Sequence, residues 1–144
     1  MTEAAFSFRG RALAGVLFDL DGTLLDTAAD IAVALGRAFA DEGHPGPDHA
    51  LVRAMIGRGA PTLVERAGAA LGLALDAEAK ARVLERFFHH YGWLQDEAQA
   101  AAVPFVGVAE GLAALHAAGL PLAVVTNKQH RFALQLLERL GLAP

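Results

Sequence analysis

The sequence predicts an α/β protein with a parallel-sheet core that is interrupted by a block of helices. Two apolar segments, residues 13–18 and 122–126, have the length and composition of buried strands, and each leads through a polar loop into a helix. Between them, from residue 28 to residue 102, apolar residues recur at helical spacing and no strand pattern occurs. Repeated strand–loop–helix units favour parallel strands, which bind ligands beyond their carboxyl ends.

The composition limits the kinds of protein that this chain can be. Its 144 residues can form one domain or two small ones, and 54% of them are hydrophobic, which is ample for a core. Without cysteine, neither a disulfide nor a thiolate metal site is possible. The net charge is -4 and the basic residues form no cluster, so we expect neither nucleic acid nor a membrane as a partner. We expect a soluble, cytoplasmic protein, and the sequence leaves its oligomeric state undefined.

The first apolar segment ends in two acids, a glycine and a threonine. Asp19 and Asp21 are two residues apart, so their side chains point the same way along an extended chain. The repulsion between paired carboxylates is relieved by a cation or a shared proton, which suits either a magnesium site or a nucleophile beside a general acid. Gly22 permits a sharp turn close to a ligand, and Thr23 adds a hydroxyl and N–H donors. This loop therefore fits an anionic substrate that is held by a metal.

Six helices are expected, at about residues 28–42, 49–55, 61–71, 77–99, 107–118 and 129–140. Asp26 or Thr27 can cap the first, while Asp48 and Asp76 can cap the second and the fourth. Residues 1–11 have no clear periodicity and are interpreted as a lead-in. We therefore expect residues 1–27 to begin the core, residues 28–102 to form a helical cap and residues 103–144 to return to the core.

Thr126, Asn127 and Lys128 follow the second apolar segment directly. A hydroxyl and backbone N–H groups before a helix can cradle a phosphate, although strand ends commonly carry polar residues. Lys128 could steer an anion or only cap the strand, and Arg58 could either reach a substrate carboxylate or remain in solvent. The aromatic residues of the fourth helix are interpreted as packing within the helical block: Phe87, Phe88, Tyr91 and Trp93.

Residues 18–24, Phe-Asp-Leu-Asp-Gly-Thr-Leu, resemble the first motif of the haloacid dehalogenase superfamily of aspartate-nucleophile phosphotransferases. Thr126 matches the threonine of its second motif, and the helical insert is similar to its type 1 cap. Residues 56–64 and 122–128 resemble segments of the bacterial phosphoglycolate phosphatase family. The resemblance implies a partial Rossmann-like core with an all-helical cap.

The same resemblance implies a Mg²⁺-dependent phosphatase that hydrolyses a small phosphorylated metabolite, with 2-phosphoglycolate as the expected substrate. Asp19 would form an aspartyl-phosphate, Asp21 would be the general acid and base, and both would bind Mg²⁺. A sugar phosphomutase of the same superfamily and a non-catalytic phospho-acceptor module are the alternatives. The residues expected to bind phosphate or substrate are Thr23, Arg58, Thr126, Asn127 and Lys128.

The superfamily also has a phosphate-bridging lysine and further metal-binding acids after its second motif, whereas this sequence ends at Pro144. Lys128 comes too early in the chain to match that lysine. Moreover, a sheet of only two parallel strands exposes both edges. We therefore expect the chain to be an amino-terminal portion of a longer protein, with very low phosphatase activity alone.

Overall fold

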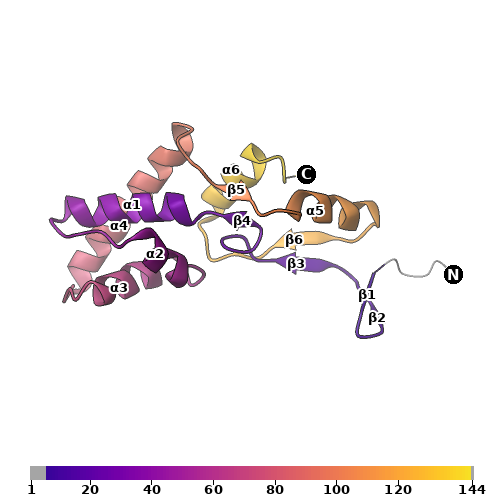
Figure 1. Cartoon of the computed structure of the whole chain (residues 1–144), viewed down its shortest axis with the longest axis horizontal. Coiled ribbons are helices and arrows are strands. Elements are labelled where there is room, and N and C mark those ends of the chain that lie inside the picture. The colour runs from indigo at the N-terminus through magenta and orange to yellow at the C-terminus, as the bar shows by residue number, and fades with distance from the viewer. Residues whose placement is uncertain (1–5, 144) are drawn as a thin grey trace.

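A computed structural model describes residues 6–143 and combines a block of four helices with a smaller part built on two parallel strands. In Figure 1 the helices α1–α4 lie at one end of an elongated molecule, and the paired strands β3 and β6 lie towards the other. We call α1–α4 the helical block. This arrangement confirms the predicted α/β class and the predicted helical insert.

The two parallel strands form the centre of the core. Strand β3 (Val16–Phe18) pairs with β6 (Leu122–Val124), with Val16 opposite Leu122 and Phe18 opposite Val124. Helix α5 (Val108–Ala117) precedes β6 and α6 (His130–Arg139) follows it. Both strands are shorter than predicted, but their parallel pairing is as predicted. Their carboxyl ends therefore meet at one edge of the sheet.

One prediction for these strands is wrong, because they are not buried. Leu17 in β3 is 72% exposed and Val125, just after β6, is 62% exposed. Helix α5 has no buried residue at all. Within residues 6–143, no element packs closely enough over Leu17 to bury it. The sheet therefore presents apolar side chains to solvent.

Two further pairs of short strands were not expected. Strand β4 (Leu25–Asp26) pairs with β5 (Val103–Pro104) in an antiparallel ladder. This ladder ties together the two segments that enter and leave the helical block (Figure 1). Near the N-terminus, β1 (Ser7–Phe8) and β2 (Arg11–Ala12) form a hairpin.

The hairpin corrects the interpretation of the lead-in, of which residues 1–5 lie outside the described range. Arg9 and Gly10 form its turn with φ values of 51° and 75°. Two consecutive residues with positive φ are typical of the two-residue turns that join the strands of a β-hairpin. Strands of two residues are too short to show a sequence periodicity, so the sequence did not predict them.

The helical block follows the predicted order, with bounds that differ by a few residues from those expected. It contains α1 (Ala28–Asp41), α2 (His49–Met55), α3 (Ala60–Ala70) and α4 (Ala77–Asp96). The caps of α2 and α4 are confirmed, because Asp48 Oδ1 accepts from the N–H of Leu51 at 2.7 Å and Asp76 Oδ1 accepts from that of Ala79 at 2.8 Å. Thr27 occupies the N-cap position of α1, but its side chain makes no capping hydrogen bond.

Two apolar clusters hold these parts together. The larger cluster fills the helical block and also contains Phe132 of α6. The smaller cluster lies in the core, around Leu20, Leu25 and Leu136. Helix α6 therefore contributes to both clusters and joins the core to the helical block. In the part of the chain that the structure describes, no helix is both long and apolar enough to cross a membrane.

Candidate active site

A cavity of about 330 Å³ lies where the carboxyl ends of β3 and β6 meet the helical block. Its core side is mainly polar, because most of it is formed by the two loops that follow these strands. Its other side is apolar and comes mainly from α1, α2, α3 and α4. The core lining is Asp19, Asp21, Thr126, Asn127, Lys128, Gln129 and Phe132, and the apolar lining of the helical block includes Ile31, Met55, Ile56, Leu63, Phe87, Phe88 and Tyr91.

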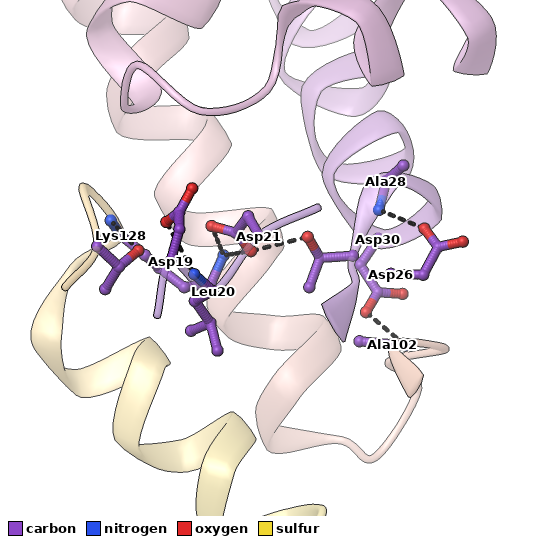
Figure 2. A network of polar contacts seen from close by, with 10 residues as sticks. Asp19, Leu20, Asp21, Asp26, Ala28, Asp30, Ala102 and Lys128 are labelled. Carbon is purple, nitrogen blue, oxygen red and sulfur yellow. Dashed lines mark hydrogen bonds and ion pairs between the residues drawn. The ribbon is translucent and has the colours of Figure 1, made fainter. Parts of the chain in front are cut away.

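Asp19 and Asp21 both line this cavity, and Figure 2 shows them beside Lys128. The N–H of Leu20 donates to Asp19 Oδ1 at 2.8 Å, which orients the Asp19 carboxylate. Thr27 Oγ1 donates to Asp21 Oδ1 at 2.7 Å from the start of α1. Gly22 follows Asp21 directly and makes the predicted turn, with φ of 77°. Its N–H donates to the carbonyl of Leu25 at 2.8 Å.

Lys128 faces the same acids from the second loop. Its Nζ donates to Asp21 Oδ1 at 2.9 Å and to Oδ2 at 3.2 Å. The Lys128 side chain is only 7% exposed and that of Asp21 only 13%. Lys128 is the one cationic side chain among the described residues that line the cavity. An ammonium group in this place adds positive charge to the cavity, and steering of an anion, one of the two roles expected for Lys128, stays a prediction.

The other residues of the second loop also border the cavity. Thr126 Oγ1 accepts the backbone N–H of Lys128 at 3.1 Å, which fixes the turn at the end of β6. Asn127 Nδ2 donates to the carbonyl of Gly57 at 2.9 Å. This hydrogen bond links the core loop to the segment between α2 and α3. The structure therefore brings Thr126, Asn127 and Lys128 to the cavity that the acid pair lines, and it brings Lys128 into contact with Asp21.

Two predicted substrate-binding residues do not line the cavity. Thr23 is exposed, and its N–H donates to the carbonyl of Leu20 at 3.1 Å. Arg58 is also exposed, although Gly57 and Gly59 on either side of it border the cavity. Their roles in binding a substrate remain predictions.

The interpretation of Asp26 as a helix cap needs correction. The N–H of Ala28 reaches Asp26 Oδ1 only at 3.4 Å, whereas Arg53 Nη2 donates to Oδ2 at 2.9 Å and to Oδ1 at 3.1 Å. This hydrogen bond from Arg53 holds the pKa of Asp26 below its ordinary value of 3.8. Asp26 therefore joins the start of the helical block to α2. No sequence signal pointed to Arg53, because it lies 27 residues further along the chain.

Asp30 is a buried carboxylate to which no sequence signal pointed. It is 3% exposed, and its two oxygens accept the N–H groups of Ala101 and Ala102 at 2.7 and 3.0 Å. Figure 2 shows it directed away from the acid pair, towards the chain that leaves the helical block. Asp30 therefore anchors the return of the chain to the core.

The aromatic residues of α4 do more than pack within the helical block. Phe87 and Tyr91 belong to its apolar cluster, as predicted, but Phe87, Phe88 and Tyr91 also line the cavity. Trp93 is 44% exposed, and the guanidinium of Arg37 lies 5.1 Å from its ring centroid. Burial raises the pKa of the Tyr91 hydroxyl, and the negative charge of Asp21 adds to this effect.

The acid pair fits a magnesium ion in its chemistry. Carboxylates supply the hard oxygen ligands that Mg²⁺ prefers, and Mg²⁺ commonly binds one or two of them together with water and substrate phosphate. In residues 6–143, no group of three or more histidine, cysteine, aspartate or glutamate side chains is placed to hold a metal. Asp19 and Asp21 place two such carboxylates on the lining of the cavity.

The sequence is similar to one family of hydrolases and to individual phosphatases. Residues 16–144 match the family described as haloacid dehalogenase-like hydrolase. The phosphoglycolate phosphatase of Caulobacter vibrioides is 43% identical over 132 residues, which are 91% of this chain and 54% of that protein. The N-acetylmuramic acid 6-phosphate phosphatase of Pseudomonas aeruginosa is 40% identical over 131 residues, which are 91% of this chain and 55% of that protein.

A solved structure agrees with the sequence comparison. The crystal structure of a predicted phosphoglycolate phosphatase from Haemophilus somnus has a TM-score of 0.79 and 31% identity. The similarity covers 90% of this chain and 58% of that one. The chain thus spans about half the length of the curated relatives that it matches.

Proposed function

Because this chain belongs to the haloacid dehalogenase-like hydrolase family, we propose that its cavity takes part in the hydrolysis of a phosphate monoester. The observation that carries the proposal is the convergence of two carboxylates, a threonine hydroxyl and an ammonium group on one cavity. The carboxylates offer a nucleophile and a proton carrier, while the hydroxyl and the ammonium group suit an anionic substrate. The proposal concerns the complete protein, of which this chain provides these residues.

In the proposed reaction, a carboxylate oxygen of Asp19 attacks phosphorus, and the bond from phosphorus to the ester oxygen breaks. The leaving oxygen takes a proton from Asp21, so an aspartyl-phosphate and an alcohol are formed. Asp21 then accepts a proton from the water that hydrolyses the aspartyl-phosphate. The contacts from Thr27 and Lys128 hold the Asp21 carboxylate in the cavity for both steps.

Binding of the phosphoryl group would involve both loops. We expect Asp19 and the backbone carbonyl of Asp21 to hold Mg²⁺, which would neutralise charge on the phosphoryl oxygens. Thr126, Asn127 and Lys128 would contact the phosphate from the opposite strand end. Thr23 and Arg58 remain candidates for substrate contacts, with a role that requires them to turn towards the cavity.

For the substrate, we propose 2-phosphoglycolate first. Several relatives carry the name phosphoglycolate phosphatase, and Lys128 offers a cation for an anionic substrate. A sugar phosphate is the second candidate, because the apolar wall with three aromatic residues suits a larger leaving group and a relative acts on N-acetylmuramic acid 6-phosphate by its name. A phosphomutase would transfer the phosphoryl group to another sugar position without releasing phosphate.

The cytoplasmic location and the lack of nucleic-acid or membrane partners stay predictions from sequence.

The test measures phosphate release from 2-phosphoglycolate and from a sugar phosphate in the presence of Mg²⁺. It also measures the aspartyl-phosphate, as protein-bound phosphate that survives acid but not hydroxylamine. Asp19→Asn should abolish both signals, because it removes the nucleophile. Asp21→Asn should abolish phosphate release. A phospho-acceptor would instead keep its protein-bound label in Asp21→Asn and lose it in Asp19→Asn. Asp96→Asn, an exposed aspartate bonded to Gln135, is the matched control and should behave as wild type. Undiminished labelling of Asp19→Asn would contradict the proposal.

A further inference from the structure

We propose that Tyr91 of helix α4 is a positioning residue that holds Lys128 against Asp21. The proposal rests on the proposed function, because it takes Asp21 to be the acid and base of the reaction. It assigns a role in the site to a residue of the helical block, which otherwise supplies apolar walls. Three observations carry it: the place of the Lys128 ammonium, the packing of the Tyr91 ring, and the state of the Tyr91 hydroxyl.

The Lys128 ammonium is held between a carboxylate and an aromatic ring. Its Nζ lies 2.9 Å from Asp21 Oδ1 on one side and 4.5 Å from the centroid of the Tyr91 ring on the other. A cation over the face of an aromatic ring is attracted by the ring quadrupole, and the attraction grows when the pair is desolvated. Lys128 has a flexible side chain with many rotamers, so a single contact would leave it free to swing. Together, ring and carboxylate define one position.

The Tyr91 ring is itself fixed from both sides. The ring of Phe132, on α6, meets it edge-on at 5.0 Å between centroids, with an interplanar angle of 78°. The ring of Phe87, one turn earlier on α4, lies at 5.8 Å. Tyr91 is 1% exposed, so the ring has little freedom to move away. The helical block thus presents a rigid aromatic face to the ammonium group.

The hydroxyl of Tyr91 does not explain the presence of this residue. Among the described residues it is buried without a hydrogen-bond partner. An unpaired buried hydroxyl costs free energy, so the useful part of the side chain is the ring. This separates the proposal from a hydrogen-bonding role, and it makes Tyr91→Phe a control that keeps the ring and removes only the oxygen.

The arrangement makes the charge environment of Asp21 depend on the helical block. Asp21 and Lys128 belong to the two core loops, but the ring that holds Lys128 belongs to α4. A displacement of α4 from α6 would remove the ring and free the ammonium group from Asp21. The helical block therefore supports the acid and base of the reaction as well as enclosing the substrate.

Nuclear magnetic resonance tests the placement directly, because lysine occurs only at positions 80 and 128. In a chain labelled with ¹³C-lysine, the signals of Lys80 serve as an internal reference, since its side chain is 40% exposed and its partner is Glu65. Protons above an aromatic face are shifted upfield. We expect the Lys128 Hε signals upfield of those of Lys80 in the wild type and in Tyr91→Phe. In Tyr91→Leu they should move to the position of Lys80.

A kinetic comparison tests the consequence. Tyr91→Leu should lower kcat about tenfold with little change in KM, the size expected of one desolvated cation–ring contact, whereas Tyr91→Phe should retain kcat. Equal losses in both variants would overturn the positioning role. So would a wild-type Lys128 signal that coincides with that of Lys80, a result that needs no folded variant. Phosphate release is measured on the complete protein; if the complete protein releases no phosphate, the proposed function fails, and the Lys128 shift still decides the placement.

Discussion

At the scale of single residues, the buried carboxylate of Asp30 has the clearest energetic role. Asp30 is 3% exposed and accepts the N–H groups of the exposed Ala101 and of Ala102, which is 2% exposed. Asp30→Ala should lower the free energy of unfolding by about 1–3 kcal/mol, because it leaves the buried N–H of Ala102 without an acceptor. Asp30→Asn keeps one acceptor oxygen and should fall between this variant and the wild type. Urea denaturation measures both, and an unchanged midpoint for Asp30→Ala would contradict the anchoring role.

The residues of the candidate site were predictable to different degrees. The meeting of Asp19, Asp21 and Thr126 followed from one rule, that neighbouring parallel strands bring their carboxyl ends to one edge. Contacts that depend on docking could not be predicted in this way. Asp30 reaches partners 71 and 72 residues away, and no local pattern encodes such a pair. The place of Tyr91 over Lys128 likewise depends on how α4 packs against α6.

At the scale of elements, α1 and the loop before α2 approach each other through two glycines. A Cβ on Gly46 would lie 2.6 Å from the Cα of Gly36, so Gly46→Ala would force the loop away from α1. We expect this overpacking to cost about 1–3 kcal/mol of stability. A Cβ on Gly36 itself meets nothing within 4 Å, so Gly36→Ala should gain about 0.5–1 kcal/mol from helix propensity. Thermal unfolding of both variants checks the opposite signs, and equal signs would contradict the close approach.

The ion pair of Arg53 and Asp26 gives a prediction that depends on pH. The folded pKa of Asp26 lies below its unfolded value, so the pair stabilises the fold above the ordinary value of 3.8 and is lost as pH falls through the folded pKa. Both side chains are partly exposed, at 49% and 31%, which limits the contribution to about 0.2–1 kcal/mol. Arg53→Gln should therefore be less stable than the wild type at pH 7.

Urea denaturation at pH 7 and at acid pH measures the difference between Arg53→Gln and the wild type. The two proteins should converge in stability once Asp26 is protonated in both states. High salt at pH 7 should also reduce their difference, because exposed charges are screened. A difference that persists unchanged at low pH would show that Arg53 acts through packing and not through its charge.

The elements themselves were predicted well where their signals are local. Asp48 and Asp76 cap α2 and α4 as expected, because a capping carboxylate bonds an N–H only three residues away. The pairs β1–β2 and β4–β5 could not be predicted, since two residues show no period. The strand before Asp19 was correctly placed, but it begins at Val16 rather than at residue 13.

At the scale of the whole molecule, the two apolar clusters have different surroundings. The cluster of the helical block is formed by residues of its four helices together with Phe132 of α6. The core cluster is smaller, and beside it β3, β6 and α5 turn apolar side chains outward. The sequence predicted buried strands because apolar runs are typical of sheets covered on both faces. Exposure of these strands depends on which elements lie over them, which no single segment encodes.

This exposure predicts self-association through the sheet. Leu17 and Val125 are large, apolar and solvent-facing, and unpaired edges of short sheets favour contact with other copies. Leu17→Lys and Val125→Lys should reduce concentration-dependent association in sedimentation velocity, because a charged side chain resists burial at a contact. Val33→Lys, at a position 45% exposed on α1 in the helical block, is the matched control and should associate as the wild type does. A wild type that stays monomeric as its concentration rises, or a Val33→Lys variant that loses association, would contradict a contact through β3 and β6.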